Sequence, residues 1–362
     1  MTRLRIQELG FVPVRPEGVT DDAVVSALRV PPEQAGTRLD RFVQSELKRT
    51  SRTRAQHIIR VSAFDRQGKR LRPSDRVKAE DHVMLWRPAW DEEEVDTELT
   101  VLFEDAHLLA VDKPALVPVH PTARYYRSTV VKLLEASRPD DRLYLAHRLD
   151  RETSGVLLLS RTPEADRAVK RIFAGEKRGP GKVKKVAERE VEKMYLAIVH
   201  GGALADHVAC DLPLELDPSS ALRVKMRVAA EGTGLTARTI FEVIERRVRP
   251  GTDDVYALVR CDLETGRQHQ IRVHLAALGH PIVGDKLYGG DDGAFARGAD
   301  GELTPEDIAR LELPRHALHA HVLALPHPIT AERVVVTSPL PADLRAFWDS
   351  LALAGDAVDA RP

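Results

Sequence analysis

The residues best suited to chemistry lie between His147 and Ser160, where a charged cluster runs directly into an apolar one. Asp150 stands between Arg148 and Arg151, and the apolar run 156–159 follows a glycine. Such a run predicts a buried strand, with Asp150 on the loop that enters it. Positive neighbours favour the ionised form of a carboxylate. The stretch therefore predicts an aspartate prepared to act as an anion, although an ordinary surface ion pair would leave the same local sequence.

Two later segments offer further candidates. Lys193–Val199 alternates as a strand does and carries Tyr195, whose ring could pack in the core or offer its face to a base. Ile271 and Leu275 have the spacing of a helix face. Arg272 lies beside them and could enter a cleft, or could point to solvent as a surface arginine.

Basic residues are concentrated near the N-terminus. Between residues 36 and 87 the chain has fourteen Lys/Arg and six Asp/Glu, a net charge near +8, whereas the whole chain carries −1. Thr37 and Ser51 are expected to cap two short helices, followed by a turn at 65–69 and a strand at 83–86. Arginines along these helices could contact a phosphate backbone, unless they form a solvated face without a partner. They are Arg38, Arg41, Arg52, Arg54 and Arg60.

Length and composition limit the class of protein. A chain of 362 residues with 43% hydrophobic and 30% charged residues is expected to fold as a soluble protein of more than one domain. Two cysteines cannot form a disulfide framework, which favours a reducing compartment. No segment has the pattern of a signal peptide or a membrane span. We expect a cytoplasmic protein, with a monomer as the default state.

Four late histidines, at 316, 319, 321 and 327, raise the question of a metal site. Their spacing matches no zinc signature, and no paired cysteines accompany them. We therefore expect no metal, with a metal hydrolase as an alternative that elemental analysis of the purified protein would test.

The rest of the chain gives a coarse element map. Strands are expected at 108–111, 237–244, 255–263 and 333–337, and helices at 129–136, 163–173 and 342–351. Residues 91–98 form an acidic linker. Residues 175–189 are expected to be a flexible basic loop, and residues 289–307 a long mobile insertion.

Three motifs together resemble those of the RluA-type pseudouridine synthases. The first is His147-Arg148-Leu149-Asp150-x-x-Thr153-Ser154-Gly155. The second is Lys193-x-Tyr195-x-Ala197-x-Val199-x-Gly201. The third runs from Thr265-Gly266-Arg267-x-His269-Gln270-Ile271-Arg272-Val273-His274 through Gly279-His280-Pro281-Ile282-x-Gly284-Asp285. The likeness covers the chain from about Leu99 onward. Ala115 departs from it, because the family usually has glycine after Lys-Pro.

The resemblance implies an α+β catalytic domain with a mostly antiparallel curved sheet and a central cleft. It implies conversion of uridine to pseudouridine in structured RNA, without metal or cofactor. Asp150 would be the catalytic aspartate, Tyr195 would stack on the uracil, and Arg272 would pair with Asp150. Arg148 and Ile271 would contact the RNA. Whether the aspartate attacks the sugar or removes a sugar proton stays open.

The basic module before this region resembles the S-four-like RNA-binding domain. The expected organisation is a lead-in at 1–30, the S-four-like domain at 31–90, the linker at 91–98, the catalytic domain at 99–352 and a tail at 353–362. Large-subunit ribosomal RNA is the expected substrate, and transfer RNA is a second possibility. A ribosome-assembly factor that binds RNA and whose catalysis is dispensable is the competing hypothesis.

Overall fold

The computed structural model describes residues 3–4, 9–19, 23–47, 52–87, 99–121, 125, 127–174, 191–220, 222, 224–290, 292–300 and 302–353. The linker expected at 91–98, the basic loop expected at 175–189 and Ser51 lie outside these residues. The chain divides into two compact units, Met1–Glu93 and Glu94–Pro362. In the described residues, no helix combines the length and the hydropathy needed to cross a membrane.

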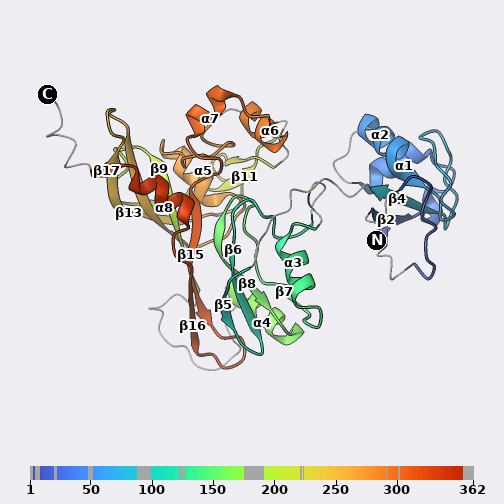
Figure 1. Ribbon diagram of the computed structural model, residues 1–362, viewed down its shortest axis with the longest axis horizontal. Helices are drawn as coiled ribbons and strands as arrows, with labels where there is room; N and C mark the ends of the chain where they lie inside the picture. Colours follow the sequence, from blue (N-terminus) through green and yellow to red (C-terminus); the bar gives the residue numbers. More distant parts are fainter. Residues whose placement is uncertain are drawn as a thin grey trace. The chain divides into compact units, whose positions relative to one another are not determined.

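The first unit is a small sheet with two helices, drawn in blue in Figure 1. Its strands are β1 (Arg3–Leu4), β2 (Val24–Arg29), β3 (Ala63–Phe64) and β4 (His82–Arg87), in the order β1-β2-β4-β3. A 3-10 turn at Pro32–Gln34 precedes α1 (Leu39–Glu46) and α2 (Arg52–Ser62). The helices bury Phe42 and Ile59 completely against the sheet.

Two expectations for the first unit need correction. The segment 1–30, expected as a lead-in that could include an edge strand, contains the edge strand β1 and also β2, which pairs on both sides, with β1 and with β4. Thr37 does not cap the first helix: the residue at the N-cap is Arg38, which makes no side-chain capping bond. The backbone N–H of Thr37 instead donates to the carbonyl of Gln34, because a turn occupies this position.

The second unit is built on one large sheet of the strand order β10-β13-β14-β9-β15-β8-β6-β5, with β16, β17 and β7 attached beside it. Its strands are β5 (Val101–Glu104), β6 (Leu108–Lys113), β7 (Tyr144–Leu145), β8 (Ser154–Ser160), β9 (Glu192–His200), β10 (His207–Cys210), β13 (Thr239–Val248), β14 (Val255–Leu263), β15 (Leu318–Pro326), β16 (Arg333–Thr337) and β17 (Ala352–Leu353). A hairpin of β11 (Leu214–Leu216) and β12 (Met226–Val228) is separate. The fold class is α+β with a mostly antiparallel sheet, as expected.

Helices cover both faces of the part of the sheet that contains β8. Alternate residues of β8 enter two different cores: Leu158 packs with Val169 of α4 (Pro163–Phe173), and Leu157 packs with Leu134 of α3 (Val130–Ser137). A strand covered on both faces needs apolar residues at every position. This double coverage explains why 156–159 is a continuous apolar run.

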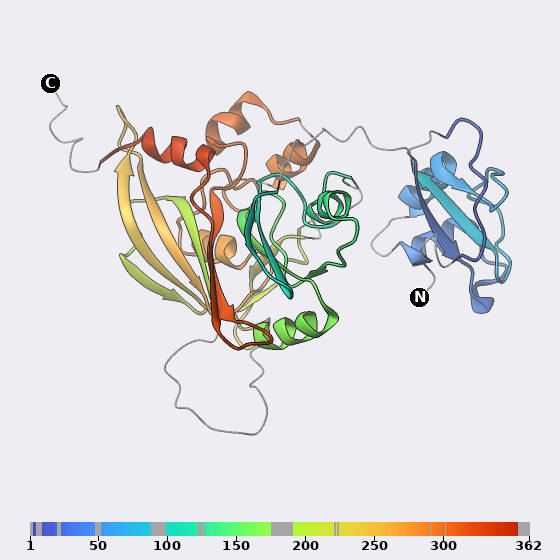
Figure 2. The same ribbon diagram turned by 60° about the horizontal axis from the view of Figure 1, so that its bottom comes forward.

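The other half of the sheet curves around α5 (Gln270–Ala277). Figure 2 shows the yellow strands β13 and β14 bending past this helix. Ile271 and Leu275 of α5 share a buried core with Phe241 of β13 and with Trp348 of α8 (Ala342–Asp349). The apolar residues whose helical spacing was expected at 271–275 therefore form the face by which α5 packs against the sheet and α8.

The prediction of a long mobile insertion after Gly289 is wrong. This segment forms α6 (Asp292–Asp300) and α7 (Pro305–Leu311), seen at the top of the larger unit in Figure 1. Thr304 and Asp307 form a capping box at the start of α7, and Arg297 of α6 ion-pairs with Asp307 at 2.6 Å. Asp307 in this segment therefore acts both at a helix end and in an ion pair.

Candidate active site

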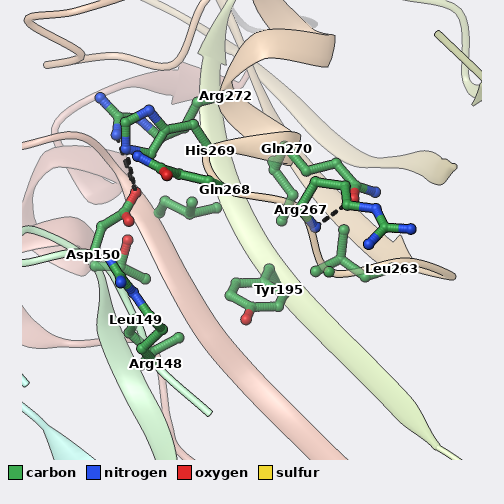
Figure 3. Close-up of a pocket in the computed structure, with 14 residues that line it drawn as sticks. Arg148, Leu149, Asp150, Tyr195, Leu263, Arg267, Gln268, His269, Gln270 and Arg272 are labelled. Atoms are coloured by element: carbon green, nitrogen blue, oxygen red, sulfur yellow. Dashed lines mark hydrogen bonds and ion pairs between the residues drawn. The ribbon is translucent and has the colours of Figure 1, made fainter. Parts of the chain in front are cut away.

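A pocket opens where the two halves of the large sheet meet. Its walls come from the loop 148–153 before β8, from Tyr195 on β9, and from 263–272, which includes the start of α5. Its volume is about 230 Å³. That is smaller than the roughly 300–1,000 Å³ typical of sites for drug-sized ligands, and suits a single flat ring better. Figure 3 shows Asp150, Tyr195 and Arg272 around this pocket.

The loop that carries Asp150 is fixed by the pairing of β8 with β15. Ser154 and Gly155 pair in parallel with His319 and Ala320. Gly155 has φ +109°, and a Cβ built there would lie 2.2 Å from the backbone oxygen of Ala320. Glycine is required at this position because any side chain would push the two strands apart. The glycine of the first motif therefore sets how closely the two halves of the sheet approach beside Asp150.

Two buried histidines hold the residues between Asp150 and β8. His316 Nε2 lies 2.8 Å from the hydroxyl of Thr153, and His319 Nδ1 lies 3.0 Å from the hydroxyl of Ser154. Burial lowers the pKa of each imidazole to about 4. Both are therefore neutral hydrogen-bonding groups at neutral pH. In the part of the chain that the structure describes, no group of three or more His, Cys, Asp or Glu could hold a metal ion.

A buried lysine ties the same loop to β6. The Lys113 ammonium donates to the carbonyls of Pro114, Val117 and Arg151, at 2.7, 2.8 and 3.1 Å. Three acceptors match the three protons of an ammonium. The pKa of Lys113 is lowered to about 7, mainly by burial and also by the neighbouring Arg315, while Asp150 opposes the shift. Lys113 thus holds the backbone directly after Asp150.

Arg272 joins two carboxylates. Its Nη1 donates to Oδ2 of Asp150 at 3.0 Å, while Nε and Nη2 donate to the two oxygens of Asp285 at 2.7 and 2.8 Å. The side chains of Arg272 and Asp285 are buried, whereas that of Asp150 is 26% exposed. The Asp150 carboxylate is therefore held from inside the protein and remains accessible from the pocket. The ion pair expected between Asp150 and Arg272 is present.

The charges around Asp150 keep it ionised. Burial would raise the pKa of this carboxyl, but its partners, among them the charged guanidinium of Arg272, outweigh burial and lower the pKa below its usual value. The buried Arg272–Asp285 pair is electrically compensated, because the pKa of Asp285 is also held low by Arg272 against the effect of burial. An anionic, partly exposed carboxylate beside a fixed guanidinium can act as a nucleophile or as a base.

Tyr195 lies on the opposite wall from Asp150 in Figure 3. It is half-buried on β9, where Cys261 and Ala320 are its partners on the adjacent strands. Burial raises the pKa of the phenol well above its usual value, and the negative charge of Asp150 adds to that shift. The ring is therefore a neutral phenol that faces the pocket at neutral pH.

Arg148 and Ile271 occupy different depths of the site. Arg148 is exposed and lines the pocket next to Asp150. Ile271 also lines the pocket but is 4% exposed and packs in the core of the curved half-sheet. Arg148 can reach a ligand outside the pocket, whereas Ile271 can form part of its floor.

The N-terminal arginines divide into two groups. Arg38 and Arg52 ion-pair with the buried Asp40, at 3.1 and 3.2 Å. Their hydrogen bonds, with one from Gln56, lower the pKa of Asp40 despite its burial, so part of their role is to join the two helices. Arg41 and Arg60 are exposed. Arg54 lies on α2, with its side chain outside the described residues.

Three residues to which the sequence analysis assigns no role complete the site: His269, Asp285 and Lys113. His269 Nε2 lies 3.7 Å from Oδ2 of Asp150. His269 and Asp285 both lie within the third motif, so their presence there was the available signal. The contact of His269 with Asp150 joins segments more than a hundred residues apart, which local spacing does not predict.

A family model, relatives in sequence and a solved structure all point to one protein family. Residues 107–277 match the family model described as RNA pseudouridylate synthase. The chain is 33% identical over 330 residues to "Ribosomal large subunit pseudouridine synthase D" of Xanthomonas campestris pv. campestris, covering 89% of this chain and 91% of that protein. It is 34% identical over 329 residues to "Uncharacterized RNA pseudouridine synthase" of Chloroflexus aurantiacus, covering 87% and 90%.

A solved structure shares the fold. "Human RNA Pseudouridylate Synthase Domain Containing 1" superposes with a TM-score of 0.55 at 24% identity, over 75% of this chain and 98% of that chain. At this identity the likeness concerns the fold.

Proposed function

This chain belongs to the RNA pseudouridylate synthase family, and from that premise we propose that it isomerises uridines of large-subunit ribosomal RNA with Asp150 as its catalytic group. It is an isomerase that acts on RNA. The observation that carries the proposed site is the ion pair of Asp150 with Arg272 at a pocket whose other wall presents Tyr195. Relatives named for the large ribosomal subunit support the substrate.

The reaction exchanges one bond between base and sugar for another. The bond between the anomeric carbon and N1 of uracil breaks, the base turns, and the anomeric carbon bonds to C5. The proton on C5 is lost and N1 gains one, so no atom enters or leaves overall. An anion next to the sugar can either attack the anomeric carbon or remove a proton from its neighbour. Both routes need Asp150 ionised, which its lowered pKa favours.

Arg272 positions Asp150 and does not remove its charge. Because the guanidinium already makes two hydrogen bonds to Asp285, its third contact aims the Asp150 carboxylate without enclosing it. Bidentate arginine–carboxylate pairs have fixed geometry. A small displacement of a reacting group costs a large factor in rate, so this support is part of the catalytic arrangement.

Tyr195 is proposed to support the uracil ring. Its raised pKa keeps the hydroxyl protonated at neutral pH, which favours stacking by the ring over proton removal by the resting phenol. Stacking of a base on an aromatic side chain contributes about 1–3 kcal/mol. That is of the same order as the few kcal/mol needed to take a base out of a helix.

Contacts outside the pocket are proposed to hold the RNA. Arg148 is placed to enter the space that the everted nucleotide leaves, because it is exposed directly beside Asp150. The N-terminal unit is proposed as an S-four-like RNA anchor, with its net positive charge supplying affinity that does not depend on sequence. The exposed Arg41 and Arg60 are its best candidates for phosphate contacts.

A cytoplasmic monomer is the proposed working form. Both cysteines, Cys210 and Cys261, are buried and unpaired, which supports a reducing compartment.

The test is the substitution Asp150→Asn, assayed for pseudouridine in an unmodified transcript of large-subunit ribosomal RNA. We expect no product from this variant and near-normal RNA affinity, while the exposed Asp140→Asn serves as a control with full activity. Mapping pseudouridines in cellular ribosomal and transfer RNA, with and without the protein, identifies the substrate. Full turnover by Asp150→Asn would overturn the proposed role, and a product in transfer RNA alone would overturn the proposed substrate.

A further inference from the structure

His269 occupies a strained position at the pocket. It is the N-cap residue of α5, with φ 57° and ψ 16°, in the left-handed region that residues other than glycine seldom adopt, although asparagine, aspartate and histidine are found there more often than the rest. Its side chain is 10% exposed and lines the pocket beside Asp150. Such strain costs about 1–3 kcal/mol and persists where the surroundings impose it, often at functional sites.

The hydroxyl of Tyr288 determines which nitrogen of His269 carries the proton. The backbone N–H of Met226 donates to the Tyr288 oxygen at 2.9 Å, and the same oxygen lies 2.8 Å from Nδ1 of His269. Among the described residues, the Tyr288 hydroxyl has no other hydrogen-bond acceptor than this nitrogen. The phenol proton is therefore donated to Nδ1, and the imidazole proton must lie on Nε2.

The groups around His269 keep the imidazole neutral. The pKa of His269 is lowered to about 4, mainly by burial and also by the positive charges of Arg272 and Arg148, while Asp150 and Asp285 oppose the shift. A neutral imidazole with its proton on Nε2 presents one N–H to the pocket. The distance of 3.7 Å from Nε2 to Oδ2 of Asp150 is too long for a hydrogen bond, so this donor remains available to a ligand.

We propose that His269 is a further catalytic residue, whose neutral Nε2–H donates a hydrogen bond to the uracil as the base leaves the sugar carbon next to Asp150. This inference rests on the proposed function. When the glycosidic bond breaks, its electron pair stays with the base, and negative charge grows on the ring and its carbonyl oxygens. A fixed N–H donor stabilises such charge. No proton leaves the imidazole, and a neutral donor does not compete with Arg272 for Asp150.

Tyr288 follows as the positioning residue of this donor. Its hydroxyl does not line the pocket, and it reaches the reaction through Nδ1 of His269. Its ring also lies under the Arg272 guanidinium, 5.0 Å from the ring centre, so the same side chain supports both groups that flank Asp150.

Two substitutions at position 269 separate a donor from a structural residue. The amide of His269→Gln can place an N–H near the position of Nε2, whereas that of His269→Asn reaches only as far as Nδ1. The left-handed backbone, however, tolerates asparagine better than glutamine. In single-turnover assays on the unmodified ribosomal RNA transcript, we expect glutamine to stay within about 10-fold of the wild type and asparagine to lose at least about 100-fold. Equal rates for the two variants, or a faster asparagine variant, would overturn the proposal.

Nitrogen-15 NMR of the imidazole gives a test that does not depend on activity. Resonances of His269, assigned by their absence in His269→Gln, should show a protonated Nε2 and an unprotonated Nδ1 at neutral pH. In Tyr288→Phe the preference for this tautomer should weaken. The acid limb of the rate profile should also move to higher pH, since the ring then protonates more easily. A purely structural role for Tyr288 would lower the rate equally at every pH, and protonation on Nδ1 in the wild type would contradict the assignment.

The two proposals fail in different ways. Absence of pseudouridine after incubation of the wild-type protein with the transcript would overturn the proposed function and leave the NMR result on His269 standing as a structural fact. A silent Asp150→Asn variant, together with wild-type rates in both His269 variants, would uphold the proposed function and overturn the role of His269.

Discussion

The guanidinium of Arg272 donates two hydrogen bonds to the buried carboxylate of Asp285, at 2.7 and 2.8 Å. Asp285 thereby fixes the plane of the guanidinium, and the remaining Nη1 has one direction in which to meet Asp150. The position of the proposed catalytic carboxylate thus depends on a residue that does not reach the pocket. This arrangement makes the shape of Arg272 as important as its charge.

Replacing Arg272 by lysine should therefore inactivate the protein although the charge is kept. A single ammonium cannot make the fork of hydrogen bonds to Asp285 and also reach Asp150. We expect Arg272→Lys to lower the single-turnover rate by about 100-fold or more, with RNA affinity little changed. The control is Arg267→Lys, an exposed arginine on the same pocket wall. Loss of equal size in both variants would show that the fork has no special role.

Alanine at Gly155 should destabilise the fold severely. The substitution places a Cβ 2.2 Å from the Ala320 oxygen and also strains a backbone of positive φ. The matched control is Gly251→Ala, where φ is +80° and no atom lies within 4 Å of the new Cβ. We expect the control to lose about 1–2 kcal/mol of unfolding free energy and Gly155→Ala clearly more. Urea midpoints compared at an unchanged denaturant slope measure both, and similar losses would contradict the steric account.

The free energy of unfolding should decrease as the pH is lowered from about 6.5, before the carboxylates become protonated. Burial lowers the pKa of His147 to about 3, and the pKa values of His269, His316 and His319 to about 4. Their unfolded pKa is about 6.5. A lowered pKa means that the unfolded state binds more protons, so stability is complete above that value and is lost as pH falls toward 4.

One of these histidines can be tested separately. Nε2 of His147 accepts the backbone N–H of Leu158 at 3.0 Å, and protonation would break this bond. In His147→Gln, an uncharged acceptor takes its place. We expect the fall in unfolding free energy between pH 6 and pH 4.5 to become shallower by up to about 1.4 kcal/mol per pH unit, the effect of one proton. An unchanged slope in urea titrations would exclude His147 as a source.

The RNA anchor can be tested in the intact chain. Arg41 and Arg60 are exposed on α1 and α2, and both are replaced by glutamine in one variant. Binding to the ribosomal RNA transcript should weaken, and the slope of log affinity against log salt should fall by about one per lost phosphate contact. Arg345→Gln, an exposed arginine on α8, is the control. An unchanged slope in the double variant would exclude these side chains from the RNA interface.

Much of the fold could be predicted because its signals are local. The apolar run of β8 predicts a buried strand, and Pro163 predicts the start of α4, where the Thr162 hydroxyl accepts the N–H of Ala165 in the structure. The helices after Gly289 contradict the expected loop because glycine and aspartate, which are common in loops, also occur in short capped helices. The capping residues Thr304 and Asp307 were the contrary signal.

The candidate site was less accessible to local reasoning. Asp150 and Arg272 are separated by 122 residues, and their expected pairing came from the family resemblance. Asp285 stands in the third motif, but its role depends on the guanidinium of Arg272, which tertiary packing brings to it. His316 and His319 raised the question of metal binding, yet they serve as neutral partners of two hydroxyls, a role that is visible only once β8 and β15 are side by side.

The short parallel pairing of β8 with β15 has a consequence for the timing of activity. Asp150 precedes β8, whereas β15 ends at Pro326, so the seam between the two half-sheets closes only after most of the chain has been synthesised. A nascent chain that stops before this strand carries the acid, the phenol and the guanidinium without the register that aligns them. An incomplete chain should therefore not modify the RNA of the ribosome that is synthesising it.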